Sequence, residues 1–461
     1  MLTKDRAAEV FAKLKKYSSA DEVEALFYGG HSALTRFANN TIHQNVAEEH
    51  YGVSVRTVFN QRTARASTNK LDEDSLKRVV QASESLARVQ QPDPDLLSVP
   101  EAGKNARPTQ SIPKRYFEQT AAITPDQRAL GVEKMVAIAT THKLTAAGIF
   151  ATSETIEGSF NSRGLSEWHT QTSSDISVTM LASDSSGWQK ANSPNVDDLD
   201  PLALAETAAR KALDSAAPRE IPAGKYTVIL EPAAVLDIVG FMFFDFGGMA
   251  ILDQRSFLNN RVGTRIFGEN INLRDDVAHP LQSGAPFDGE GMCRQGVQLV
   301  ENGVVKRLVY ARATAEKMRK SEYKDKVGSI EPTGHGFPLP NEIGEAPINI
   351  VFGEPENPRT LDQMVASTER GVLVTRLWYI REVDPYEKIL TGMTRDGTFY
   401  VENGKIRHGV RNFRFNESLL HMLSNVEQMG KPMRASGEES FDMVVPAMKV
   451  REFNFTEVTK F

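Results

Sequence analysis

The side chains that most often carry chemistry are scattered in this chain. Its nine histidines include no two that lie three to five positions apart, and no His-Glu-x-x-His zinc motif occurs. His43 and His50 are the closest, with Glu48 and Glu49 between them, and a solvent-facing strand explains this group most simply. The single cysteine, Cys293, has no histidine nearby in the sequence, which favours a small buried residue over a nucleophile.

Two acidic groups could act in acid–base chemistry or bind a hard metal ion. They are Asp275-Asp276 and Asp288-Gly289-Glu290. Glycine and the preceding Pro286 are typical of turns, in which aspartate accepts hydrogen bonds from its own backbone. The structural interpretation is therefore favoured, while an autonomous metal-dependent hydrolase built on these carboxylates stays open as an alternative.

The segment with the most binding chemistry runs from Trp378 to Phe399, with Arg376 just before it. It combines aromatic rings, arginines and a hydroxyl-rich glycine loop. Arginine forks and glycine amides can hold a carboxylate or a peptide main chain. The alternative is an arginine–aspartate pair that pins a turn, for instance Arg395 with Asp396 or Asp384.

Composition limits the class of protein that carries these residues. The chain has 461 residues, 40% of them hydrophobic and 25% charged, which is typical of a globular protein with several domains. Its formal net charge of −6 argues against a nucleic-acid binder. The most apolar stretch, 235–252, is interrupted by Asp237 and Asp245 and does not predict a membrane span. The N-terminus lacks the pattern of a signal peptide, so we expect a cytoplasmic protein.

The first half of the chain contains two similar stretches. Phe37-Ala38-Asn39-Asn40 resembles Phe160-Asn161-Ser162-Arg163, and the same offset relates Val53-Ser54-Val55-Arg56 to Ile176-Ser177-Val178-Thr179. We interpret residues 20–90 and 144–214 as two copies of a unit of three strands and a helix. The predicted strands of the first copy are 22–28, 32–38, 41–47, 51–58 and 62–67. A helix over 3–17 precedes them, the linker 91–114 follows, and a helix over 125–141 leads into the second copy.

The pattern of predicted elements changes after a second linker, 215–224. A strand over 225–231 and a helix over 232–246 precede short strands and glycine turns, and Asn302-Gly303 and Asn403-Gly404 predict hairpins. The later elements that we predict are strands at 294–310, 347–353, 371–381 and 397–402 and helices at 361–367 and 416–429. The predicted fold class is α+β, with an N-terminal domain of duplicated strand-and-helix units over 1–220 and a mainly β C-terminal domain over 221–461.

Several segments resemble the TldD/PmbA family of metallopeptidases, once described as modulators of DNA gyrase, and in particular its PmbA or TldE branch. The segments are Ala38 to Gln44, Ala66 to Asn69, Gly224 to Pro232, Pro286 to Gly291 and Leu390 to Phe399. The resemblance implies a heterodimeric peptidase. Its TldD branch carries a His-Glu-x-x-x-His motif that binds zinc and supplies a general base.

In this chain the three motif positions match Leu236, Asp237 and Phe241. Leucine and phenylalanine have no lone pair for zinc, and a catalytic zinc normally takes three protein ligands. The resemblance therefore implies no catalytic residue, no metal and no bound cofactor in this chain, with zinc on a TldD-type partner. We expect the chain to help form a chamber for flexible peptides and to form a homodimer when alone. The candidate substrate-binding residues are Arg376, Tyr379, Arg381, Thr394, Arg395 and Asp396.

Two other functions remain open at this point. One is the autonomous peptidase based on Asp275, Asp276, Asp288 or Glu290. The other is a regulatory protein-binding module of a gyrase or toxin–antitoxin system. The sequence does not name the peptide substrate or decide between a homodimer and a heterodimer.

Overall fold

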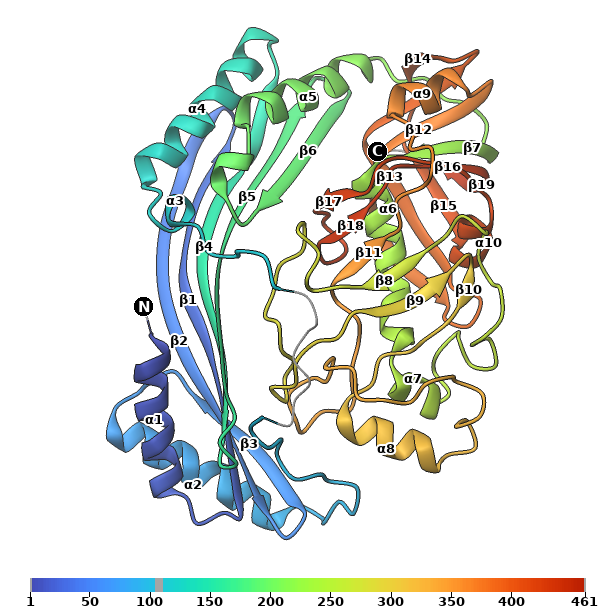
Figure 1. The fold of residues 1–461 in the computed structure, drawn as a ribbon. Coiled ribbons are helices and arrows are strands. Elements are labelled where there is room, and N and C mark those ends of the chain that lie inside the picture. The colour runs from blue at the N-terminus through green and yellow to red at the C-terminus, as the bar shows by residue number, and fades with distance from the viewer. Residues whose placement is uncertain (1, 104–110, 460–461) are drawn as a thin grey trace.

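The structure is a computed structural model that describes residues 2–103 and 111–459. A long, bent sheet forms the N-terminal half, and the C-terminal domain lies against one of its faces (Figure 1). The strands of the long sheet are β1 (Glu22–Ala38), β2 (Thr41–Phe59), β3 (Arg62–Thr68), β4 (Thr145–Asn161), β5 (Ser166–Leu181) and β6 (Ser186–Ser193). They are ordered β3-β2-β1-β4-β5-β6, with antiparallel pairing between neighbours.

The prediction of separate strands at 22–28 and 32–38, and at 41–47 and 51–58, is wrong. β1 runs without a break through Gly29 and Gly30, and β2 runs without a break through residues 48–50. Gly29 and Gly30 have φ values of 130° and 152°, and a Cβ atom on either would lie within 2.3 Å of a backbone oxygen of a neighbouring strand. Glycine at these two positions allows β2 and β4 to lie close to β1, and it does not end β1.

The N-terminal helices cover the other face of the sheet near its two ends (Figure 1). They are α1 (Lys4–Tyr17), α2 (Glu73–Val89), α3 (Glu118–Ala121), α4 (Pro125–Thr141) and α5 (Pro201–Asp214), together with the 3₁₀ helix η1 (Val196–Asp198). Asp72 caps α2, and Thr124 with Pro125 opens α4 through a capping box, so α4 has the predicted range 125–141. In α5 the buried stripe consists of small residues, and Leu202 and Leu213 are about 40% exposed.

The two strand-and-helix units are arranged as the sequence predicted. β1, β2, β3 and α2 form one unit, and β4, β5, β6 and α5 form the other. Their first strands, β1 and β4, pair at the centre, so the strand order of one half mirrors that of the other. Separate apolar clusters under α1–α2 and under α4–α5 bury the two ends of the sheet.

The C-terminal domain contains two further sheets. Its strands are β7 (Gly224–Leu230), β8 (Leu273–Asp275), β9 (Val297–Glu301), β10 (Val304–Val305), β11 (Ile350–Phe352), β12 (Arg370–Asp384), β13 (Ile389–Glu402), β14 (Lys405–Gly409), β15 (Phe413–Ser418), β16 (Val426–Met429), β17 (Met433–Ala435), β18 (Met443–Val445) and β19 (Met448–Val458). One sheet has the order β10-β9-β8-β11-β18-β17. In the other, β12-β7-β19-β15-β13-β14, a pairing of β12 with β13 closes a ring, and β16 joins β19.

The short helices of this domain are α6 (Pro232–Val239), the 3₁₀ helix η2 (Gly240–Phe246), α7 (Gly248–Leu252), α8 (Arg312–Lys320), α9 (Leu361–Ala366) and α10 (Leu419–Ser424). Both predicted Asn-Gly hairpins are confirmed, at β9–β10 and β13–β14. The predicted helix over 416–429 is wrong, because only α10 is helical there and β15 and β16 flank it. An apolar stretch of that length can form a helix or a strand, and pairing with β19 makes β15 and β16 strands.

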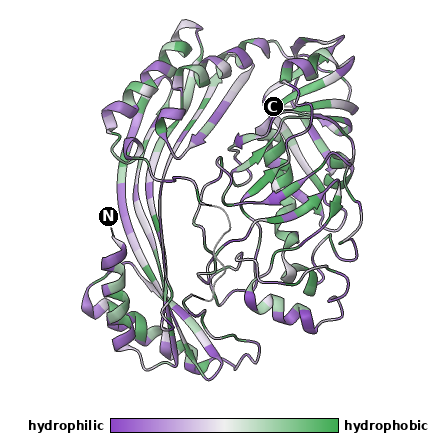
Figure 2. Ribbon diagram, in the orientation of Figure 1, coloured by the Kyte–Doolittle hydropathy of each residue, from purple (hydrophilic) through white to green (hydrophobic). Residues whose placement is uncertain are grey.

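Hydrophobic residues concentrate in the C-terminal domain around α6, whereas the middle of the long sheet is coloured mostly purple and white (Figure 2). The main core cluster runs from Tyr226 to Phe455 and lies entirely in this domain. Within the described residues, no helix is long and apolar enough to cross a membrane.

Candidate functional site

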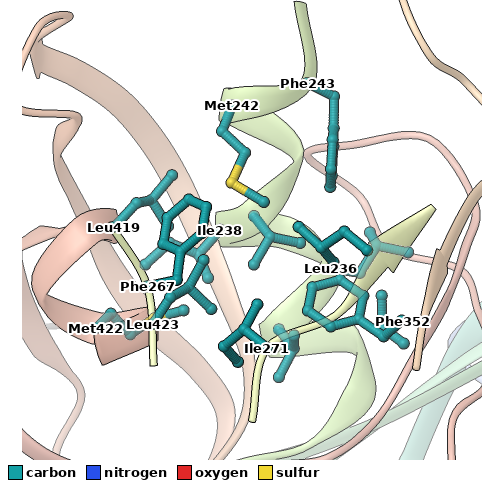
Figure 3. Packing of buried hydrophobic residues seen from close by; sticks show 14 of the residues in the cluster. Leu236, Ile238, Met242, Phe243, Phe267, Ile271, Phe352, Leu419, Met422 and Leu423 are labelled. Carbon is teal, nitrogen blue, oxygen red and sulfur yellow. The ribbon is translucent and has the colours of Figure 1, made fainter. Parts of the chain in front are cut away.

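The helix at the degenerate motif positions is the central helix of the C-terminal domain. Pro232 opens α6, and from Ala234 to Val239 every side chain is buried. Figure 3 shows Leu236 and Ile238 among the phenylalanines, leucines and methionines of the main core. Phe241, in η2, is partly buried and packs against the same cluster. Two of the three motif positions are thus part of the apolar core.

The third position, Asp237, holds a loop in place. Its Oδ1 accepts hydrogen bonds from the backbone N–H groups of Glu438 and Glu439, each at 3.2 Å. These residues belong to a segment that we call the capping loop, residues 436–442. Oδ2 of Asp237 is buried and has no hydrogen-bond partner. Burial raises the pKa of Asp237 to about 7, and the two N–H donors oppose that shift only in part.

The capping loop also contacts the long sheet. Nζ of Lys190, on β6, donates to the carbonyl oxygen of Gly437 at 3.0 Å. Arg434, just before the loop, bonds the side chain of Asn192 on β6 and lies 3.1 Å from Asp442. The loop is therefore held between α6 on one side and the last strand of the N-terminal sheet on the other.

The side chains at α6 do not fit a zinc ion. A catalytic zinc site needs about three nitrogen, sulfur or oxygen donors with an open fourth position. Here Leu236 and Phe241 are hydrocarbons, and one oxygen of Asp237 is already hydrogen-bonded to the capping loop. A Cβ atom on Gly437 would lie 2.2 Å from Asp237 Oδ1, so the loop also fills the space in which further ligands would be needed.

A second cluster joins the β12–β13 hairpin to β6. Arg376 and Asp396 form a buried ion pair, with Nε of the arginine 2.8 Å from Oδ2. The hydroxyl of Ser186 donates to Asp396 Oδ1 at 2.6 Å. The Arg376 guanidinium lies 4.6 Å from the ring centroid of Trp188. The arginine–aspartate pairing that the sequence left open is thus present, mainly with Arg376.

The six candidate substrate-binding residues divide into two groups. Arg376, Asp396 and Thr394 are buried, and the Thr394 hydroxyl bonds Asn412 and the Phe413 amide. The other three, Tyr379, Arg381 and Arg395, are exposed.

The exposed group forms a surface of rings and guanidinium groups on the hairpin. Arg395 lies over the Trp378 ring at 4.6 Å, and Arg381 lies over the Tyr379 ring at 4.5 Å. Tyr379 has a φ of 55°, at an irregularity in the pairing of β12 with β13, and its N–H donates to Glu439 of the capping loop at 2.7 Å. The bulge therefore turns these side chains outward beside the loop that covers α6.

A cavity of about 630 Å³ opens between the two halves of the molecule next to this cluster. Asp396, Gly397 and Thr398 form one side, and the serine-rich turn between β5 and β6 forms the other. The segment from Leu390 to Phe399, one of those that carry the family resemblance, therefore lines an interdomain space as well as the exposed surface.

The acidic groups have structural contacts. Asp275 is fully buried, lies 3.0 Å from His335 Nε2, and accepts N–H groups from Ile348 and Asn349. Asp276 accepts the N–H of Ala278.

Asp288 accepts the N–H groups of Glu290, Met292 and Gly336, as an aspartate that caps a turn does. Burial is the main cause that raises the pKa of Asp288, to about 7, and also that of Glu290, which lies beside Arg312. Among the described residues, no three metal-binding side chains are arranged to hold an ion.

Sequence reasoning missed the residues that join the two halves. Lys190, Asn192 and Trp188 on β6 contact groups more than 180 positions away. Such contacts have no local sequence signal, because only the packing of the long sheet on the C-terminal domain creates them.

Family models match three consecutive parts of the chain. The PmbA/TldA metallopeptidase C-terminal domain matches residues 223–457, which is more than half of the chain. Domain 1 of the same family matches residues 23–87, and its central domain matches residues 123–216. The chain belongs to the PmbA/TldA metallopeptidase family.

Individual relatives of this PmbA/TldA family member extend over nearly its whole length. Metalloprotease PmbA of Escherichia coli O157:H7 is 22% identical, over 94% of this chain and 92% of that protein. The crystal structure of TldE from Thermococcus kodakarensis superposes with a TM-score of 0.84 at 20% identity, covering 98% of this chain and all of that one. A putative modulator of DNA gyrase from Thermotoga maritima has a TM-score of 0.83, also at 20% identity, over 98% of this chain and 99% of its own.

Proposed function

We propose that this chain is the zinc-free partner subunit of a cytoplasmic heterodimeric metallopeptidase, and that a TldD-type chain supplies the zinc and the general base. The observation that carries the proposal is the state of α6. Leu236 is part of the apolar core, and Asp237 is bonded to the capping loop, so the motif positions stabilise the fold instead of binding a metal.

The exposed residues of the β12–β13 hairpin are the proposed substrate contacts. Tyr379, Arg381 and Arg395 present rings and guanidinium groups that can hold peptide carbonyls and carboxylates. Arg376 and Asp396 hold the hairpin against β6, and Thr394 bonds Asn412, so these three residues position those contacts. A flexible peptide is the substrate class that such a surface fits, because extended chains expose their backbone groups to it.

A mixing assay with an unstructured fluorogenic peptide tests this function. We expect no cleavage by this chain alone and zinc-dependent cleavage after a TldD-type subunit is added. In the mixture, Arg381→Ala and Arg395→Ala should raise KM severalfold with little change in kcat, because they remove contacts made equally in the ground and transition states. Arg265→Ala, at an exposed arginine outside this surface, is the control.

Two outcomes would overturn the proposal. Cleavage by the purified chain alone, abolished by Asp288→Asn or Glu290→Gln, would identify an autonomous peptidase. A mixture that remains inactive although the two chains associate would leave this chain without the proposed role.

A further inference from the structure

The N-terminal half of β2 is an unprotected sheet edge. Only Val53–Thr68 forms the β2–β3 hairpin, so β2 residues 41–52 have a single neighbour, β1. Among the described residues, no backbone N–H or C=O of β2 residues 41–52 is hydrogen-bonded to a backbone group outside β1. Nearly every residue from Thr41 to His50 is exposed, on both faces of the strand. Long edges of this kind are uncommon in proteins unless something pairs with them.

The other unit shows what the architecture places on such an edge. An offset of 123 residues relates Phe37 to Phe160 and Val53 to Ile176, and it relates 43–50 on β2 to 166–173 on β5. That part of β5 is covered by the chain itself. The N–H of Thr172 donates to the carbonyl oxygen of Arg115 at 2.9 Å, and the N–H of Phe117 donates to the Thr172 hydroxyl at 3.1 Å.

The segment that makes this contact belongs to no sheet, because residues 111–117 form neither helix nor strand. Arg115 and Phe117 bond β5 at Thr172. Thr172 is buried, whereas the equivalent stretch of β2 is exposed. The equivalent edge of β2 therefore leaves room for a segment supplied from outside the chain.

The direction of the backbone follows from the same comparison. In an antiparallel strand, alternate residues direct their N–H and C=O groups to the same side. The N–H of Thr172 points to the edge of β5, and the offset of 123 residues maps Thr172 to an odd-numbered position of β2. The odd-numbered residues Asn45 and Ala47 therefore direct their N–H groups to the open edge. Val46 and Glu48 face β1.

The chemistry of the edge favours a neutral or basic peptide. Glu48 lies on this part of β2, and residues 41–51 contain no lysine or arginine. On the face turned to the C-terminal domain, Leu34, Val46 and Ala151 line a shallow hollow of about 330 Å³ that can take apolar side chains. The edge therefore offers main-chain hydrogen bonds, a weak attraction for basic side chains and a place for apolar ones.

We infer that residues 41–51 of β2 form a docking strand on which an extended, neutral or basic peptide is added to the long sheet. The inference rests on the proposed function, since it assigns the substrate peptide a second contact away from the β12–β13 hairpin. Main-chain hydrogen bonds supply the affinity in this mode of binding, and they require an extended segment rather than a particular sequence.

Fluorescence anisotropy with a labelled, unstructured, lysine-containing peptide and this chain alone tests the inference. Ala47→Pro removes an edge-facing N–H at a position where a strand edge tolerates proline, and it should weaken binding by about tenfold. Ala47→Thr keeps the N–H and should bind within about twofold of the wild type. An acidic peptide of the same length should bind more weakly than the basic one.

Hydrogen exchange on the wild-type chain provides a readout that needs no variant. Saturating peptide should slow exchange of the Asn45 and Ala47 amides, while Val46 and Glu48, which already face β1, should change little. Unchanged exchange, or equal affinity of Ala47→Pro and wild type, would overturn the inference. So would sedimentation that shows Ala47→Pro dissociating a homodimer with peptide affinity unchanged, since the edge would then pair two copies. Because no partner subunit is present, an inactive heterodimer would refute the proposed function alone.

Discussion

Asp237 shows how one buried carboxyl can hold a loop in place. Its Oδ1 holds two amides of the capping loop, and its Oδ2 is buried without a hydrogen bond. A charged carboxylate is costly in such surroundings, so burial raises its pKa to about 7. Asp237 therefore holds the capping loop, and because it is buried it titrates near neutral pH.

This titration predicts a pH dependence of stability. Between about pH 4 and 7, the folded protein keeps a proton on Asp237 that the unfolded chain has released, so the free energy of unfolding falls as pH rises through this window. Asp237→Asn retains the acceptor oxygen but does not titrate. We expect it to be more stable than the wild type at pH 8 by on the order of 1–3 kcal/mol, and to differ little near pH 4.

Urea unfolding of both proteins at pH 4, 6 and 8 measures this difference. The comparison isolates Asp237, because Asp288 and Glu345, whose pKa values are also raised to about 7, titrate in both proteins. Parallel stability profiles for variant and wild type would show that Asp237 is ionised in the folded protein throughout.

The packing of the β12–β13 hairpin on β6 includes one buried ion pair, Arg376 with Asp396. Arg376→Met removes the main partner of Asp396 and leaves that carboxylate buried with Ser186 and the more distant Arg395. Breaking a buried pair in this way costs about 3–5 kcal/mol. Ser186→Ala removes one hydrogen bond and should cost about 1 kcal/mol. Urea unfolding at pH 7 compares the two, and equal losses would mean that the pair contributes little.

The long strands depend on glycine at their closest approaches. Gly30 and Gly224 have similar φ values, 152° and 150°. A Cβ atom on Gly30 would lie 1.9 Å from the Glu154 carbonyl oxygen, whereas one on Gly224 would meet nothing within 4 Å. Gly30→Ala should therefore lower the thermal midpoint much more than Gly224→Ala, which carries only the backbone strain. Equal midpoints in calorimetry would mean that β1 and β4 separate at little cost.

The sequence predicted elements wherever the signal was local. The Asn-Gly hairpins, the helix over 125–141 and the paired strand-and-helix units follow from turn chemistry and periodicity. The continuous β1 was missed because Gly29-Gly30 permits a turn and a close strand contact equally well. The length of α10 was missed because pairing with β19, not propensity, ends it. The burial of Arg376 and Asp396 was not predictable, since β6 provides it from a distant part of the chain.

The whole molecule joins two kinds of structure with different roles. The C-terminal domain is a closed apolar core around α6, with the capping loop bonded to Asp237. The apolar clusters of the N-terminal sheet lie toward its two ends, and the first half of β2 is exposed. In our account the domain supplies a fixed wall and the sheet supplies a surface for extended peptides, while a second subunit supplies the metal chemistry.

The zinc content of this chain, purified alone and dialysed against a small excess of zinc, measures whether α6 binds the metal. With hydrocarbon at two of the proposed motif positions and the third bonded to the capping loop, we expect substoichiometric zinc, unchanged in Asp237→Asn, and stoichiometric zinc only when a TldD-type subunit is present. One tightly bound zinc per chain that is lost in Asp237→Asn would contradict this expectation.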